Sequence, residues 1–287
     1  MALRGATPLV ATAALALGAV VPAAVGGDAP RPEPGAQAAN SSLRGVTPTW
    51  KTFTTSTGGG SKIVVSTGGN ITGFASPARP GRYYEHIAAG EIGEGYILCY
   101  AGSAARYDVG MYSGGFAAPT TTSSAVTRDT TDGKVRLIQN FNLVHGGAAG
   151  PSNFVVTMKV VNRTNQQLRN VMIRRHVDFD IDTEGTQGWA DYYSNHARTK
   201  GTVSAFHDPS VAPAGLESHG IMMMIQTGGN WETRVTEQYL DTTCDPTPAP
   251  MDANYVSRGD YGDTIIWRLG TIGAKKTKVV TLRYMRY

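Results

Sequence analysis

The sequence predicts an all-β protein: a large antiparallel β-sandwich of ten or more short strands with little helix. Segments in which apolar and polar residues alternate recur along the chain, separated by turns rich in glycine, asparagine, aspartate and threonine. Their connections are mostly too short for the crossovers of a parallel sheet, and no repeat of fixed period indicates a propeller or solenoid. A chain of 287 residues, 41% of them hydrophobic, is long enough to bury one large core.

The expected strands follow one another along most of the chain. They are placed at 62–66, 71–75, 94–100, 107–112, 126–129, 134–143, two within 154–182, 202–206, 220–226, 264–269 and 277–284. Thr67-Gly68-Gly69-Asn70 joins the first two as a hairpin turn, because glycine and asparagine accept positive φ. Residues 232–240 carry the one helix-like pattern and are expected to form a short helix.

The N-terminus has the features of an export signal. Arg4 precedes an apolar run over 9–25, and Ala36-Gln37-Ala38 is a small-x-small cleavage pattern. The run falls short of the roughly 20 residues that span a bilayer, so a membrane anchor is the weaker alternative. We expect a secreted protein with no membrane segment after cleavage. The predicted organisation is a signal peptide over 1–38, a flexible tail over 39–60 and a single β-sandwich domain over 61–287.

Charge and cysteine content narrow the class further. The net charge is only +4 and is spread along the chain, which does not indicate a nucleic-acid partner. Cys99 and Cys244 are the two cysteines, and in an exported chain they favour one disulfide over two free thiols. The chain-entropy treatment gives such a long ring a stabilisation of roughly 4–5 kcal/mol.

The most chemically capable stretch is a predicted strand whose odd positions from Val171 to Ile181 are nearly all apolar. Its even positions display Arg174, His176, Asp178, Asp180 and Asp182, so one face packs on a core and the other is expected to be accessible. A histidine beside carboxylates suits general acid–base chemistry, and paired carboxylates suit glycoside hydrolysis. His176 and Asp178 are therefore the catalytic candidates. The alternative is a structural face of salt bridges.

The strand runs into an acidic loop that resembles a calcium-binding loop of the EF-hand type. Asp180, Asp182 and Glu184 match its first three ligand positions, Thr186 would offer its carbonyl, and Asp191 stands where a bidentate glutamate is usual. Three departures are the glutamate at the third of these positions, the aspartate at the last, and a strand instead of a helix before the loop. The prediction is a Ca²⁺ site, and the alternative is an acidic strand end that is solvated or paired with Arg174 and Arg198.

An aromatic cluster follows the acidic loop. Trp189, Tyr192, Tyr193 and His196 combine flat rings with polar groups, the combination with which protein surfaces bind sugars. They are the candidate ligand-binding residues. Packing of the same rings over the sandwich is the alternative.

Several motifs resemble those of a group of uncharacterised secreted bacterial β-sandwich proteins. The matching residues are Asn162, Thr164, Leu168, Asn170, Val171, then Arg174, Arg175, Asp178, Asp180 and Ile181 as R-R-x-x-D-x-D-I, with the run 95–100 and the hairpin 267–273. The resemblance covers most of residues 60–287 and implies a large sandwich akin to the galactose-mutarotase-like supersandwich. It implies no named activity, but mutarotase-like sandwiches use histidine and acidic groups on a concave sheet.

These observations predict a secreted binding or surface protein whose partner is an extracellular glycan or another cell-surface component. A carbohydrate ligand and a structural calcium are the finer hypotheses. The alternative is a carbohydrate-active enzyme, mutarotase-like or glycoside-cleaving, that uses the face of His176, Asp178 and Asp180. The sequence has no G-x-S-x-G, H-E-x-x-H or P-loop motif, so serine acyl transfer, zinc proteolysis and nucleotide chemistry have no support.

Overall fold

The computed structural model describes residues 42–43, 48–54, 61–79, 82–87, 93–144, 153–179, 181, 194–199, 201–207, 220–225, 229–238, 240–258 and 261–286. All of them belong to one compact unit that spans 31–287. Their regular structure is entirely strand, which confirms the all-β prediction. Within these ranges there is no helix long and apolar enough to cross a membrane.

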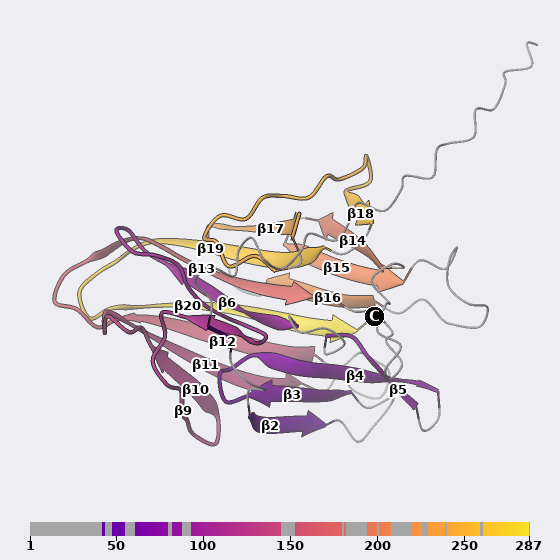
Figure 1. Ribbon diagram of the computed structural model, residues 1–287, viewed down its shortest axis with the longest axis horizontal. Coiled ribbons are helices and arrows are strands. Elements are labelled where there is room, and N and C mark those ends of the chain that lie inside the picture. The colour runs from indigo at the N-terminus through magenta and orange to yellow at the C-terminus, as the bar shows by residue number, and fades with distance from the viewer. Residues whose placement is uncertain are drawn as a thin grey trace, which may run out of the picture. The chain divides into compact units, whose positions relative to one another are not determined.

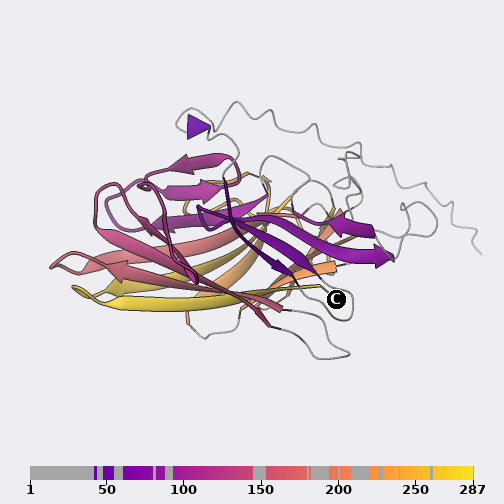
Figure 2. The same cartoon turned by 90° about the horizontal axis from the view of Figure 1, so that it is seen from below.

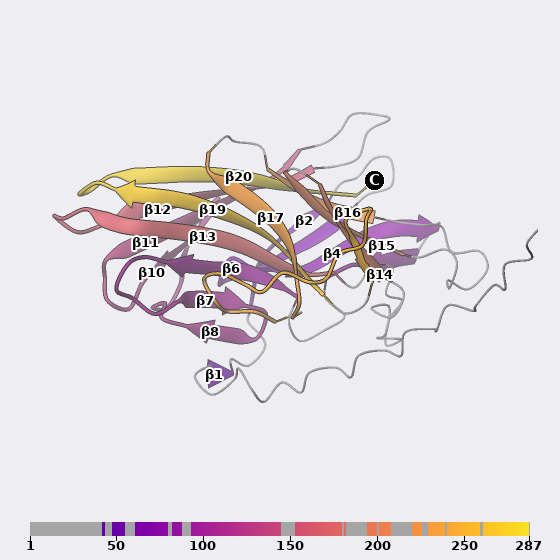
Figure 3. The same ribbon diagram turned by 90° about the horizontal axis from the view of Figure 1, so that it is seen from above.

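The described strands form three antiparallel sheets. The seven-stranded sheet runs in the order β1 (Ser42–Leu43), β8 (Tyr112–Gly114), β7 (Arg106–Val109), β6 (Glu94–Cys99), β13 (Leu168–Asp178), β19 (Gly262–Ile272) and β17 (Trp231–Thr236). Its strands β6, β7 and β8 lie side by side in Figure 3.

The nine-stranded sheet faces the same core. Its order is β18 (Val256–Arg258), β14 (Ser194–Thr199), β15 (Thr202–His207), β16 (Gly220–Ile225), β20 (Thr277–Arg286), β12 (Asn153–Asn162), β11 (Val135–Val144), β10 (Ala125–Asp129) and β9 (Thr120–Thr121). The long pairings of β20 with β12 and of β12 with β11 can be followed in Figures 1 and 2.

A smaller sheet completes the fold. It has the order β2 (Thr49–Thr54), β3 (Lys62–Ser66), β4 (Ile71–Arg79) and β5 (Arg82–Glu85). The turn at residues 67–70 joins β3 to β4 as expected, and Gly69 adopts a φ of 89° there. A side chain at Gly69 would also collide with Gln139, since an added Cβ would lie 2.3 Å from its Nε2.

The core is built from the alternating apolar positions that the sequence predicts. In β11 and β12 buried residues alternate with more exposed ones over most of each strand, and these buried side chains join those of β13, β19 and β20 in one hydrophobic cluster. Side chains on one face of a strand recur every second residue, so each long strand contributes a row of them. The chain crosses between the sheets at residues 163–167, because β12 pairs with β11 and β20 whereas β13 pairs with β6 and β19.

Two predictions about elements are wrong. The pattern over 232–240 is not a helix: β17 pairs with β19 from Trp231 opposite Trp267 onward. The segment 39–60, expected to be a loose tail, contains β2, whose Phe53 ring lies 5.0 Å from that of Phe154. Both elements are strands because they pair with, or pack on, parts of the chain remote in sequence.

Candidate functional site

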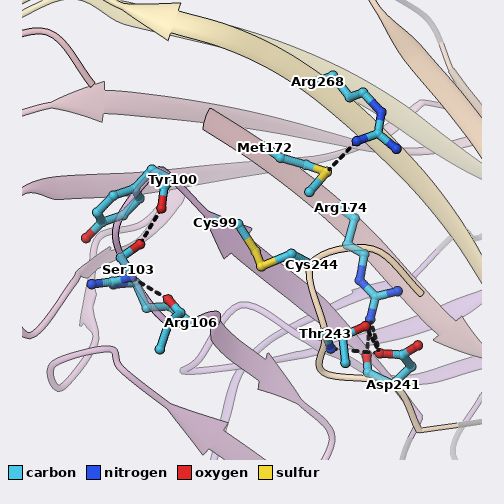
Figure 4. Close-up of a disulfide and its surroundings, with 11 residues drawn as sticks. Cys99, Tyr100, Ser103, Arg106, Met172, Arg174, Asp241, Thr243, Cys244 and Arg268 are labelled. Carbon is cyan, nitrogen blue, oxygen red and sulfur yellow. Dashed lines mark hydrogen bonds and ion pairs between the residues drawn. A yellow bond between two sulfur atoms is a disulfide. The ribbon is translucent and has the colours of Figure 1, made fainter. Parts of the chain in front are cut away.

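The polar face of β13 is buried, so the expectation that it is displayed to solvent is wrong. Arg174, His176 and Asp178 are 1%, 0% and 5% exposed. The segment 237–250 supplies residues that meet this side of the seven-stranded sheet, and Cys244 in it forms the predicted disulfide with Cys99 of β6 (Figure 4). Neither catalytic candidate is therefore open to a substrate.

Arg174 is held by the covering segment. Its Nη2 donates to both the carbonyl and the carboxylate Oδ1 of Asp241, the latter at 3.2 Å (Figure 4). The same Oδ1 accepts hydrogen bonds from the N–H and the hydroxyl of Thr243 at 2.7 and 2.6 Å. Burial lowers the pKa of Arg174 to about 10 although Asp241 opposes the shift. This contact fits the structural alternative, in which an arginine of the face pairs with a carboxylate.

His176 is enclosed by backbone. A Cβ added at Gly262 would lie 2.2 Å from Cε1 of His176 and 2.7 Å from Oγ1 of Thr236, so only glycine fits there. The Thr236 hydroxyl donates to the Gly262 carbonyl at 2.8 Å and so holds β17 against β19 beside His176. A general base must come within hydrogen-bond reach of its substrate, and in the described structure His176 has no exposed surface for such a contact.

The opposite face of β13 carries a fully buried ion pair. The carboxylate of Glu94 accepts hydrogen bonds from the Arg175 guanidinium, from the Tyr284 hydroxyl at 2.7 Å and from the Ile71 N–H at 2.7 Å. Arg175 also donates to the Gly69 carbonyl at 3.0 Å. These partners come from all three sheets. Burial raises the pKa of Glu94, against the opposing effect of Arg175, and burial also raises that of Tyr284.

Apart from the two faces of β13, the structure has an open cleft of about 480 Å³. It lies between the edge strand β17 and the β14–β18 end of the nine-stranded sheet. These three strands appear close together in Figure 1. The residues lining it are Arg198, Thr199, Trp231, Glu232, Thr233 and Tyr255. Its volume is in the usual range for small-molecule sites.

Backbone contacts fix the walls of this cleft. The Thr233 hydroxyl donates to the Thr199 carbonyl at 3.0 Å, which ties β17 to β14. The N–H of Arg198 donates to the Tyr255 carbonyl at 3.1 Å. The Trp231 ring lies against the β14–β15 turn, where Gly201 has a φ of 80° and an added Cβ would come within 3.0 Å of the ring. Trp231 is thus carried on a paired strand, and Tyr255 on the turn that leads into β18.

Tyr255 is the exposed aromatic of the cleft, with 57% of its surface accessible. Its φ of 60° is unusual for a residue other than glycine. The turn that imposes it is held by Asp252, whose Oδ1 accepts from the N–H groups of Asn254 and Val256 at 2.7 and 3.1 Å. Such strained positions persist where the surroundings enforce them and are common at functional sites.

Most of the remaining predicted site residues lie outside the described ranges. These are the calcium candidates Asp180, Asp182, Glu184, Thr186 and Asp191, and the aromatic candidates Trp189, Tyr192 and Tyr193. His196 belongs to β14 by its backbone, two residues before Arg198, but its side chain is not described. Within the described ranges no three histidine, cysteine, aspartate or glutamate side chains gather as a metal site would require. Calcium binding stays a prediction.

No protein-family model matches the chain, and no curated protein matches it either. Among solved structures it is similar to a galactose mutarotase related enzyme from Lactobacillus acidophilus, at 12% identity and a TM-score of 0.41, over 83% of this chain and 97% of that one. It is also similar to a polysaccharide lyase, at 12% identity and a TM-score of 0.40, over 85% of this chain but 33% of the lyase. At these values neither likeness carries an argument about activity, and neither tests the R-R-x-x-D-x-D-I resemblance.

Proposed function

We propose that this protein is a secreted carbohydrate-binding protein and that the cleft lined by Trp231 and Tyr255 is its binding site. The observation that carries the proposal is that the exposed Tyr255 ring and the half-buried Trp231 ring line one cleft of about 480 Å³ together with polar groups. Aromatic faces present apolar area to the C–H face of a sugar ring, and neighbouring polar groups orient its hydroxyls.

The polar groups of the cleft suit hydroxyl ligands. Glu232 receives Arg234 at 2.5 Å and Arg268 at 3.2 Å, both on Oε1, so Oε2 is positioned to accept a sugar hydroxyl. Thr199 is exposed, and its hydroxyl can both donate to and accept from a ligand. Acceptors and donors are thus present at the mouth of an apolar pocket.

A binding role is favoured over the enzyme alternative by the burial of the catalytic candidates. His176 and Asp178 are 0% and 5% exposed, and the segment pinned by Cys244 lies on their side of the sheet. General acid–base catalysis needs contact between these groups and a substrate. The cleft can bring a ligand into contact with protein side chains, but these are Trp231, Tyr255 and their polar neighbours and not His176 or Asp178.

The test is a screen of the secreted chain against a glycan array, followed by titration calorimetry with the best oligosaccharide. We expect Trp231→Ala and Tyr255→Ala each to weaken binding at least about tenfold, because each removes one wall of the cleft. Val279→Ala, which shortens an exposed apolar side chain in β20, is the matched control and should bind normally. Unchanged affinity in Trp231→Ala would exclude this cleft as the site.

A further inference from the structure

The cleft contains one cation without an anionic partner among the described residues. The Arg198 guanidinium lies 5.7 Å from the centroid of the Tyr255 ring, and none of the ion pairs within the described ranges includes it. Its side chain is half-buried, so the charge is only partly hydrated. An arginine stacked on a tyrosine is held in one orientation and directs its donors along a fixed plane.

Among the described residues that line the cleft, the one carboxylate is already paired with arginines. Glu232 pairs with Arg234 and Arg268, and Asp245 pairs with the same two arginines at 2.8 and 3.4 Å. Two carboxylates therefore balance two guanidinium groups in this network. Among the described residues of the cleft, Arg198 is then the positive charge that these pairs leave unbalanced, and it attracts an anion in preference to a neutral group.

We propose that the ligand of the cleft is an anionic oligosaccharide, one whose sugar carries a carboxylate or sulfate group that binds Arg198 while the sugar ring lies on Trp231 or Tyr255. This inference rests on the proposed carbohydrate-binding function and adds the class of sugar. Planar guanidinium donors match the paired oxygens of such groups and form two parallel hydrogen bonds to them. Arg198 is then the residue that determines specificity, and the aromatic rings supply affinity for any sugar.

Contacts within the fold hold Arg198 and the two aromatic rings in place. Arg198 and Tyr255 are linked through backbone as well as through the stacked side chains, since the Arg198 N–H donates to the Tyr255 carbonyl. The Asp252 turn fixes Tyr255, and β17 fixes Trp231. The cation and the two rings thus lie on elements that are pinned before any ligand arrives, which limits the entropy lost on binding.

The experiment compares four ligands by calorimetry with the secreted chain: oligogalacturonate, its methyl ester, a sulfated galactose oligosaccharide and a neutral one. Methyl esterification removes the charge and changes little else, so it isolates the contribution of Arg198. We expect one anionic ligand to bind at least about tenfold more tightly than its uncharged counterpart. Which of the two does so distinguishes carboxylate from sulfate recognition. The preference should shrink as salt is raised, because the contact is partly exposed.

Variants separate the two proposals. Arg198→Gln should abolish the preference for the anionic ligand and leave binding of the uncharged one, whereas Arg163→Gln, a surface arginine on the β12–β13 connection, should change neither. Equal binding of charged and uncharged ligands that is still lost in Trp231→Ala would overturn the anionic inference and keep the carbohydrate site. A preference that persists in Arg198→Gln would also overturn it. Binding that is the same in Trp231→Ala would overturn both.

Discussion

Two groups of polar residues in this protein differ in whether their hydrogen bonds are made inside the fold. The buried cluster of Glu94, Arg175 and Tyr284 is closed, because the Glu94 carboxylate accepts from two side chains and a backbone N–H. In the cleft, Arg198 has no anionic partner among the described residues, and Tyr255 is 57% exposed. A closed network holds sheets together, whereas an open one is available to a ligand.

The raised pKa values of the buried groups are not evidence of catalysis in this protein. Perturbed pKa values often mark functional sites, and those of Glu94 and Tyr284 are raised by burial. Both groups are enclosed by three sheets and reach no solvent. The raised pKa values are therefore the consequence of a structural ion pair, and we look for the functional groups where side chains are accessible.

The largest expected effect comes from opening the buried cluster. Glu94→Ala leaves the Arg175 charge buried without its partner and should lower the free energy of unfolding by about 3–5 kcal/mol. Urea unfolding of the two proteins measures the difference. Glu94→Gln keeps the shape and tests the charge alone if the alanine variant does not fold. Glu232→Gln, in a half-exposed ion pair, is the control and should cost under about 1 kcal/mol. Equal losses at both positions would refute the distinction between the two groups.

The disulfide is the next test, because it pins the segment beside the polar face of β13. Replacing Cys99 and Cys244 by alanine opens a ring that spans 145 residues of sequence and should cost about 2–5 kcal/mol. Amide hydrogen exchange should then rise in residues 237–250 before it rises in β13. If that segment stays protected in the variant, Arg174–Asp241 and packing hold it without the disulfide.

The sequence predicted best what is local. Alternation over residues 134–143 and 154–162 predicted long strands, and both form, since the period of side chains along a strand is a property of the strand itself. The disulfide prediction followed from there being only two cysteines in a chain that we expect to be exported. Neither inference needed knowledge of which strands are neighbours.

The sequence failed where distant segments meet. The alternation in β13 predicted one apolar and one open face, but it could not show that Asp241, 67 residues after Arg174, and Cys244 belong to a segment that covers the second face. Arg198, Trp231 and Tyr255 likewise come from three separate segments, and no spacing motif links them. The nearest signal was His196, two residues from Arg198 on the same strand.

A calcium test extends the comparison to the acidic segment from Asp180 to Asp191, which lies in sequence between Arg175 of the buried cluster and Arg198 of the cleft. If Asp180 to Asp191 binds Ca²⁺, the metal stabilises the folded chain by about 2.7 kcal/mol at a hundredfold excess over its dissociation constant. Thermal unfolding after chelation, with and without added calcium, should then show a rise in the midpoint that Asp182→Ala abolishes. Asp252→Ala, which alters a different acidic turn, should keep the rise. No change in the wild type at millimolar calcium would end the hypothesis.

The smallest effect on stability is expected from a third polar group, around Asp132, whose exposure is intermediate between that of the buried cluster and that of the cleft. Asp132 is 27% exposed and accepts from Tyr100 at 2.7 Å, Thr130 at 2.7 Å and Arg106 at 2.9 Å. Partial burial raises the pKa of Asp132, but the hydrogen bonds from Thr130 and Tyr100 outweigh it and lower the pKa to about 2.

A carboxyl with a lowered pKa stabilises the fold above its ordinary pKa of 3.8, and this contribution is lost as the pH falls towards about 2. Asp132→Asn should therefore cost about 1–2 kcal/mol at neutral pH, after allowance for partial exposure, and much less near pH 2.5. Urea unfolding of both proteins between pH 6 and about pH 2.5 gives the two differences. A cost that does not change with pH would mean that the hydrogen-bond geometry, and not the charge of Asp132, stabilises this turn. The exposed fraction of a polar side chain would then not predict how much it contributes to the free energy of unfolding. The difference between the buried cluster and the cleft would have to be explained by the hydrogen-bond partners of each group alone.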